Sequence, residues 1–341
     1  MMKNNILHYD QFNIQQKASY HLIQNDLRFI YTVFQSAPTN NFFLAFMPLL
    51  GTIIDGAEDW VKAYNNSQKN KINIPTFNLE EELYYEKMRS AIKMFEQPYK
   101  DMYEKLRVLY KDSEKHFASK CKKIAKILRL YDVFGVDFAN EKYCGNTILN
   151  SYYIPDFKYG NIDGEKIKLM SIIAGKYINY FNATRSYKVD NTIVFSFKDY
   201  GGLSKSPVGN SFSHKFVLFC LLCQLQFVSS CVEQFILEEC TTKLRIEYLQ
   251  YYYTSKIVPQ INKIVNTNFQ FNTKFVCKRF RHSMAHYKVG VSLKPDEVMP
   301  EKMFYGLVEK HFQCDYFELK SFILDALNRL SNEIKYFLNL K

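Results

Sequence analysis

Apolar residues recur at helical spacing, three or four positions apart, along most of the chain. Two helix starts are marked by Asn78 with Glu81 and by Asp315 with Glu318, the spacing of a capping box. Pro48 predicts a kink. We expect helices over residues 9–36, 41–65, 78–97, 99–131, 213–266 (one very long helix or two consecutive ones), 273–289, 300–312 and 315–340.

The pattern changes between residues 132 and 212, where Gly, Asn, Asp and Pro recur. The segment NTIVFSFKDYGG (191–202) alternates apolar and polar positions and ends in a turn signal, which predicts a short strand or hairpin near 187–200. A domain boundary is expected near 205. It separates a mainly helical regulatory or sensing domain (1–204) from a helical bundle (205–341), and the expected fold class is all-α.

Composition agrees with a folded helical protein. The 341 residues are 47% hydrophobic and 16% aromatic, enough for a sizeable core, and the low counts of Gly (12) and Pro (9) favour long helices. The net charge of +11 favours a polyanionic partner, nucleic acid or an anionic membrane, although the same Lys-rich composition also follows from AT-rich coding DNA.

The cysteines and apolar runs indicate a cytoplasmic chain. The N-terminus lacks an apolar secretory segment, so the eight cysteines are expected to be reduced. Cys220 and Cys223 form a C-x-x-C inside a continuous apolar run, which favours core packing over metal or redox chemistry. The runs at 42–54 and 216–232 are too short or too interrupted to predict a stable membrane span. We expect no metal and no cofactor.

Two further segments have more than one interpretation. The basic stretch 115–129 is best explained as the solvated face of a bundle helix, with RNA, an acidic partner or a membrane surface as alternatives. The tyrosines of EYLQYYYTSK (247–256) are best explained by packing between helices or across a dimer, with stacking on unpaired bases as the alternative.

The segment CKRFRHSMAHYKVG (277–290) concentrates chemistry-bearing residues. On a helix that turns about 100° per residue, Arg281, Ala285, His282 and His286 fall on one arc of about 140°. The opposite side carries an apolar stripe of Phe280, Met284 and Tyr287 that is expected to face a core.

This segment resembles the R-polar-x-x-x-H motif of the HEPN superfamily, whose nuclease members carry it on a late helix of a compact helical bundle. The matching string is Arg281-His282-Ser283-Met284-Ala285-His286, and the resemblance covers residues 205–341. It implies a metal-independent endoribonuclease that works through the 2′-hydroxyl of RNA, in antiphage defence or as a toxin. The implied catalytic residues are Arg281, His286 and His282.

The resemblance also implies a homodimer, because in the family the Arg and His of two protomers meet at the interface. Lys278, Arg279, Tyr287 and Lys288 are the expected RNA-binding residues, and an inhibitor or antitoxin protein is a further expected partner. Some HEPN toxins carry a modified Tyr two positions after the His, whereas here Lys288 stands there. The alternative is a non-catalytic helical module for RNA binding, protein binding or dimerisation, with ordinary surface histidines.

Overall fold

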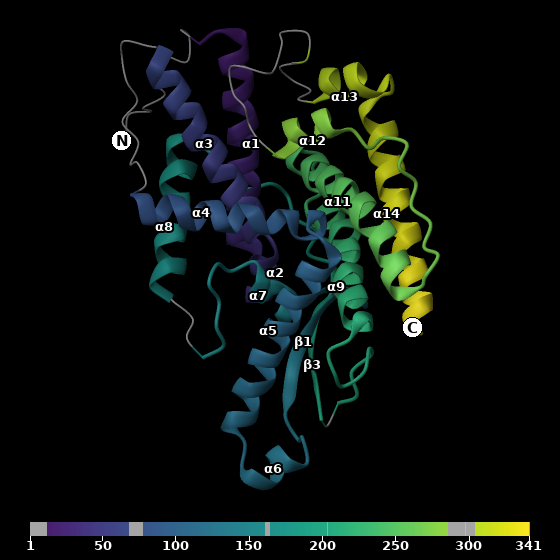
Figure 1. The fold of residues 1–341 in the computed structure, drawn as a ribbon. Helices are drawn as coiled ribbons and strands as arrows, with labels where there is room; N and C mark the ends of the chain where they lie inside the picture. The colour runs from purple at the N-terminus through teal and green to yellow at the C-terminus, as the bar shows by residue number, and fades with distance from the viewer. Residues whose placement is uncertain are drawn as a thin grey trace.

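The computed structural model describes residues 12–67, 78–160, 164–202, 204–285, 297 and 304–340. The fold is mainly helical, and it includes one small three-stranded antiparallel sheet (Figure 1). The expectation of an all-α chain is therefore correct for most of the described residues and wrong for the sheet.

The first helices form one side of the molecule in Figure 1. They are α1 (Ile14–Ser36), α2 (Asn40–Ala45), α3 (Met47–Ser67), α4 (Leu79–Ser90) and the 3-10 helix η2 (Ala91–Glu96). Asn13 and Asn78 cap α1 and α4 through complete capping boxes, which confirms the start predicted at Asn78. The predicted kink appears as a break at Phe46. Pro48 is accepted in the first turn of α3, where its missing N–H costs no helical hydrogen bond.

The middle of the chain contains the sheet and the helices around it. These are α5 (Tyr99–Lys120), α6 (Lys123–Ile127), β1 (Asp132–Ala139), β2 (Lys142–Asn146), α7 (Thr147–Tyr152), α8 (Gly164–Tyr180) and β3 (Phe195–Gly201), with strand order β2-β1-β3. The helix predicted over 99–131 is thus interrupted after Lys120, and α8 was not predicted.

The hairpin lies elsewhere than predicted. β3 falls within the predicted segment, but the hairpin is formed by β1 and β2, and β3 pairs with β1 from a distance. The side chains of β1 are buried on both faces, so the strand lacks the alternation that marks a half-exposed strand. The turn residues Asn140 and Glu141 both have positive φ, but Glu in place of the usual Gly gives no turn signal in the sequence.

The last part of the chain is a group of packed helices. They are α9 (His214–Phe227), the π-helical turn η3 (Val228–Val232), α10 (Glu233–Phe235), α11 (Thr241–Val265), α12 (Lys278–Ala285), α13 (Tyr305–Phe312) and α14 (Tyr316–Leu338). Residues 213–266 were expected to form either one very long helix or two consecutive helices, and they form two consecutive helical runs. Asp315 caps α14 by accepting from the Glu318 amide, as predicted.

Buried side chains settle two of the open interpretations. Cys220 and Cys223 are fully buried in the core, and burial raises the pKa of both thiols. Tyr248, Tyr251 and Tyr253 are also buried. Their burial confirms the interpretation that these tyrosines pack between helices, and it excludes stacking of these three rings on unpaired bases. Among the described residues one helical run, at 214–235, is long and apolar enough to cross a membrane, and 83% of its apolar window is buried inside the protein.

One hydrophobic core extends across position 205. It joins α1 and α3 with α9, α11 and α14, and β2 packs directly against α9. Side chains from the first half of the chain therefore reach the motif helix α12, which packs on α11.

Candidate motif site

The motif helix α12 begins at Lys278, later than predicted, and is described as far as Ala285. Phe280 and Met284 are fully buried, which confirms these two members of the predicted apolar stripe, and the third, Tyr287, lies outside the described residues. Ala285 is buried as well, and the Arg281 side chain is only 12% exposed. The buried face is therefore wider than predicted, and Arg281 belongs to it and not to an open polar arc.

Arg281 is bound by a carboxylate from the first half of the chain. One guanidinium nitrogen, Nη2, donates to both carboxylate oxygens of Glu96, the last residue of η2. The guanidinium carbon lies 5.4 Å from the ring centre of Tyr252 and 5.5 Å from that of Tyr253, both on α11. The two rings fix the position of the cation, and Glu96 neutralises it.

Arg281 and its neighbours shift each other's pKa values. Burial opposes the charge of Arg281, but Tyr253 and Glu96 outweigh it and raise the pKa of the guanidinium. Burial and the proximity of Arg281 lower the pKa of the Lys93 ammonium. Arg281 thus stays charged while a neighbouring lysine loses proton affinity, an arrangement suited to holding one oxyanion.

A second arginine fixes the end of α12. Arg245 on α11 donates to the backbone carbonyl of Met284 and forms an ion pair with Asp26 on α1, with 3.2 Å between Arg245 Nη2 and Asp26 Oδ2. Both side chains are fully buried. Helix α1 therefore contacts, through Arg245, the turn that directly precedes His286.

The other predicted residues divide into three groups. Lys278 and Arg279 are exposed on the outer side of α12, and His282 is half-buried. His286, Tyr287 and Lys288 lie outside the described residues. The sequence interpretation did not include His311 on α13, whose ring nitrogen lies 3.9 Å from Cys277 Sγ. Burial and then Arg279 lower the pKa of His311, which favours a neutral imidazole.

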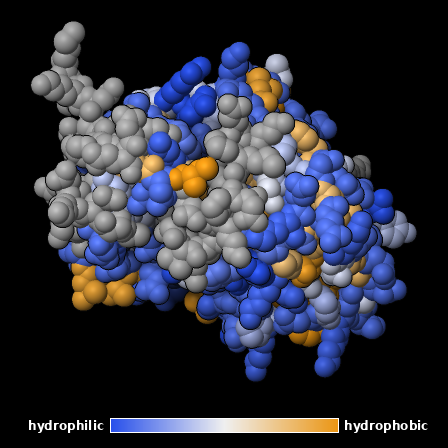
Figure 2. All heavy atoms as spheres, turned by 90° about the horizontal axis from the view of Figure 1, so that it is seen from above, coloured by the Kyte–Doolittle hydropathy of each residue, from blue (hydrophilic) through white to orange (hydrophobic). Residues whose placement is uncertain are grey.

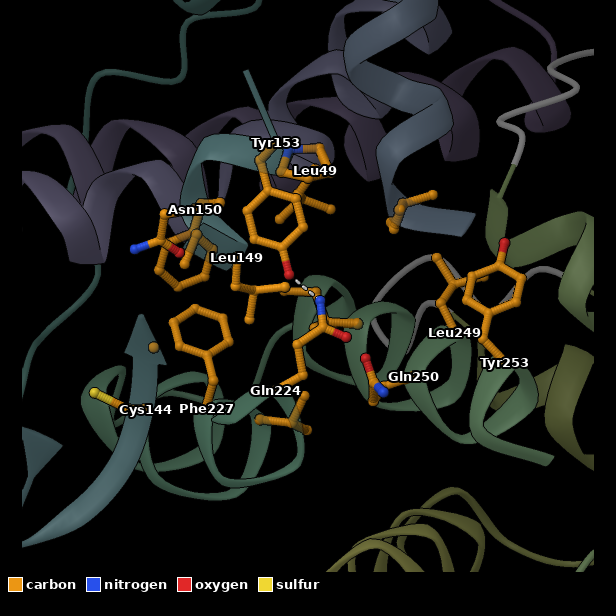
Figure 3. Close-up of a pocket in the computed structure, with 17 residues that line it drawn as sticks. Leu49, Cys144, Leu149, Asn150, Tyr153, Gln224, Phe227, Leu249, Gln250 and Tyr253 are labelled. Carbon is orange, nitrogen blue, oxygen red and sulfur yellow. Dashed lines mark hydrogen bonds between the residues drawn. The ribbon is translucent and has the colours of Figure 1, made fainter. Parts of the chain in front are cut away.

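A cavity adjoins the Arg281 site. It has a volume of about 60 Å³ and lies between α3, η2, β2, α7, α9 and α11. Figure 3 shows Tyr153 and Gln224 pointing toward each other across it, with Leu249 and Tyr253 on another side. Tyr253 therefore lines the cavity and also contacts Arg281.

The cavity is apolar with a few amide groups. Gln224 Nε2 donates to the Tyr153 hydroxyl, and Asn150 Nδ2 donates to the Asn41 carbonyl at 3.2 Å. Asn150 Oδ1 and Gln224 Oε1 have no hydrogen-bond partner within the described part of the chain. Two buried amide oxygens can accept hydrogen bonds there, from water or from a small neutral molecule.

No protein-family model, curated protein or solved structure matches the chain. The functional interpretation therefore depends on the residues and geometry described above.

Proposed function

We propose that the chain is a metal-independent endoribonuclease of the HEPN type, acting as a homodimer in the cytoplasm. Arg281 binds the scissile phosphate, and His286 with His282 carries the proton transfers. Lys278 and Arg279, with Tyr287 and Lys288 further along the same segment, follow the RNA backbone. Antiphage defence or toxin action, with an inhibitor or antitoxin partner, completes the proposal.

The supporting observation is the way in which Arg281 is presented. Its guanidinium lies beside two tyrosine rings and already binds both oxygens of an oxyanion, the Glu96 carboxylate. The phosphodiester of RNA offers two oxygens that share one negative charge, as a carboxylate does, so it can replace a carboxylate on a planar guanidinium. In the proposed enzyme Glu96 occupies the phosphate position until RNA displaces it.

The chemistry needs three elements. A base removes the 2′-hydroxyl proton, and the oxygen attacks phosphorus to give a crowded phosphorane with an additional negative charge. Arg281 stabilises that charge through its N–H groups. An acid protonates the departing 5′-oxygen, which leaves a 2′,3′-cyclic phosphate. Imidazole titrates near neutrality, so the histidines suit both proton steps.

The coupling of α12 to the first half of the chain supports a regulatory role for that half. Glu96 holds Arg281, and Asp26 holds Arg245, which in turn holds the Met284 carbonyl. A movement of α1 or η2 would therefore change the position of the motif. In the proposal, release of these contacts activates the nuclease.

The same ion pair favours a second candidate function, a non-catalytic helical interaction module. An arginine that is 12% exposed and neutralised by a carboxylate is also a common structural element. In this alternative, α12 is fixed for packing, and the exposed Lys278 and Arg279 bind a partner electrostatically.

RNA cleavage in the presence of EDTA distinguishes the two. The full-length protein should cleave RNA and leave cyclic phosphate ends, and His286→Ala should reduce the rate by at least about 100-fold. His21→Ala, a histidine change on α1 far along the chain from the motif, is the matched control and should keep the wild-type rate. Size-exclusion chromatography should show dimers for all three proteins. An inactive wild-type protein, or an active His286→Ala protein, would favour the interaction module.

A further inference from the structure

The far end of the molecule carries an ordered turn that projects from the sheet. Helix α6 lies beyond the ends of α5, β1 and β3, at the bottom of Figure 1. Arg129 adopts a left-handed conformation with φ 53°, and the amides of Arg129 and Leu130 donate to the carbonyls of Lys126 and Ala125. These two bonds form a Schellman motif, which ends the helix and returns the chain into β1. We call residues 120–130 the α6 tip.

The α6 tip exposes three large aliphatic side chains. Ile124 is 72% exposed, Ile127 71% and Leu128 60%, and no side chain of α6 is buried. The three lie within about 100° of arc on the helix, so they form one face. Exposing three large aliphatics side by side is costly in water, which indicates that this face is covered in the functional state.

Positive charge surrounds this aliphatic face. Residues 115–131 contain six cations and no carboxylate: Lys115, Lys120, Lys122, Lys123, Lys126 and Arg129. All six side chains are exposed. The Glu114 carboxylate on α5 lies 3.8 Å from the Arg129 guanidinium, and Asp132 and Asp199 line a pocket together with Lys120.

The opposite end of the molecule has a different surface. Figure 2 views that end, where the coloured atoms are mostly hydrophilic and the apolar ones occur as separate spots. Exposed aliphatics elsewhere, such as Leu79 at 72% and Leu237 at 61%, stand without a comparable cluster of lysines around them in sequence. Leu79 and Leu237 therefore lack the basic surround that the α6 tip has.

We propose that the α6 tip binds an anionic lipid surface, with Ile124, Ile127 and Leu128 entering the interface and the lysines contacting lipid phosphates. A projecting tip is better matched to a flat, deformable lipid surface than to a groove in a partner protein. The apolar residues of the tip itself are aliphatic, and the aromatic rings on which unpaired RNA bases stack, Phe117 and Tyr131, lie on either side of it in the sequence. Lysine side chains can lay their methylene stems along the apolar layer and keep the ammonium groups at headgroup level.

The expected mode of attachment is peripheral. One short apolar face with a basic surround gives reversible binding that depends on both anionic lipid and ionic strength. This proposal is independent of the ribonuclease proposal, because the α6 tip shares no residue with the motif site.

Vesicle co-sedimentation of the full-length protein tests the proposal. Binding is expected to vesicles of phosphatidylcholine mixed with phosphatidylglycerol and not to pure phosphatidylcholine, and it should weaken as salt is raised. The double variant Ile124→Ser, Leu128→Ser should lower the affinity at least about tenfold. The triple variant Lys122→Gln, Lys123→Gln, Lys126→Gln should also weaken binding and reduce its salt dependence.

The matched control is the double variant Leu79→Ser, Leu237→Ser, which removes two equally exposed aliphatics elsewhere and should bind as the wild type does. All the changes are at exposed positions, and circular dichroism should show the wild-type fold. Absence of binding to the anionic vesicles, or equal loss in the control, would overturn the proposal. A tip variant that loses RNA affinity but keeps vesicle binding would assign the surface to nucleic acid instead.

Discussion

Asp26 on α1 and Arg245 on α11 form an ion pair in which neither side chain is exposed to solvent. Asp26 Oδ1 also accepts from the hydroxyls of Thr241 and Thr242, and Arg245 donates to the Met284 carbonyl. The threonine hydroxyls and the Met284 carbonyl replace part of the hydration that this buried charge pair loses. The pair joins α1, α11 and α12 at one point.

Removing one partner of this pair should be costly. Asp26→Ala leaves the Arg245 guanidinium buried without its counterion, and we expect the free energy of unfolding to fall by about 3–5 kcal/mol. Urea denaturation followed by circular dichroism measures the change. The double variant Asp26→Leu, Arg245→Met removes both charges and should be less destabilised than Asp26→Ala. A double variant as unstable as the single one would show that packing, and not the unpaired charge, accounts for the loss.

The Arg281–Glu96 ion pair gives a prediction about RNA. Glu96→Gln keeps the shape of the side chain but removes the negative charge that competes with phosphate, so RNA affinity should rise severalfold. Fluorescence anisotropy with a labelled single-stranded RNA measures it. Because Glu96 is 31% exposed, the loss of stability should be modest, about 1 kcal/mol.

The control for this change is Glu104→Gln, which removes a carboxylate paired with Arg107 three residues along α5. It alters the net charge equally, so it should raise RNA affinity less than Glu96→Gln does. Equal effects of the two variants would mean that net charge alone attracts RNA and that Glu96 does not occupy the phosphate position.

The sequence predicted those parts of the fold that local residues determine. The capping box at Asn78 and the buried stripe of Phe280 and Met284 were predicted correctly, because each depends on residues within one or two helical turns. β1 and its turn were not predicted, since a strand buried on both faces and an Asn-Glu turn have no local signal.

The surroundings of the motif could not be predicted for the same reason. Glu96 is 185 positions from Arg281 and Asp26 is 219 positions from Arg245, so no pattern in the sequence links them. Arg281 was expected on the solvent-exposed side of the helix because a helical projection assigns every charged residue to the polar face. In the fold, a remote carboxylate and two tyrosine rings allow that charge to be partly buried.

The cavity provides a third prediction. Tyr153→Phe removes the hydroxyl that accepts from Gln224 Nε2 and leaves a further amide group without a partner at the cavity wall. We expect the free energy of unfolding to fall by about 1–3 kcal/mol. The control Tyr336→Phe changes a side chain that is 87% exposed and should have no measurable effect. A Tyr153→Phe protein as stable as wild type would show that water or a bound molecule replaces the lost partner.

The last prediction concerns Asp137, a carboxyl group that is 5% exposed in the middle of β1. Burial raises its pKa to about 6, partly opposed by a hydrogen bond from Asn41. Neighbouring groups include the Gly145 backbone and the Asn150 amide, with Cys144, Cys223 and Cys231 nearby. Because its Oδ2 has no hydrogen-bond partner within the described residues, the folded protein favours the neutral form.

The sign of the pH effect follows from the raised pKa. In the unfolded chain an aspartate titrates near about 3.9, so between about pH 4 and pH 6 the folded state holds a proton that the unfolded state has released. The contribution of Asp137 to stability therefore falls as the pH rises through this range and stays low above it. The total loss should be on the order of 2–3 kcal/mol.

Asp137→Asn tests this directly, because an amide is neutral at every pH. Urea unfolding should show Asp137→Asn gaining stability relative to the wild type as the pH rises from about 4 to about 7. The control Asp325→Asn, at a side chain that is 55% exposed, should show no such gain. A difference between Asp137→Asn and wild type that stays constant with pH would mean that Asp137 ionises normally in the folded protein, and that its surroundings are better solvated than its burial indicates.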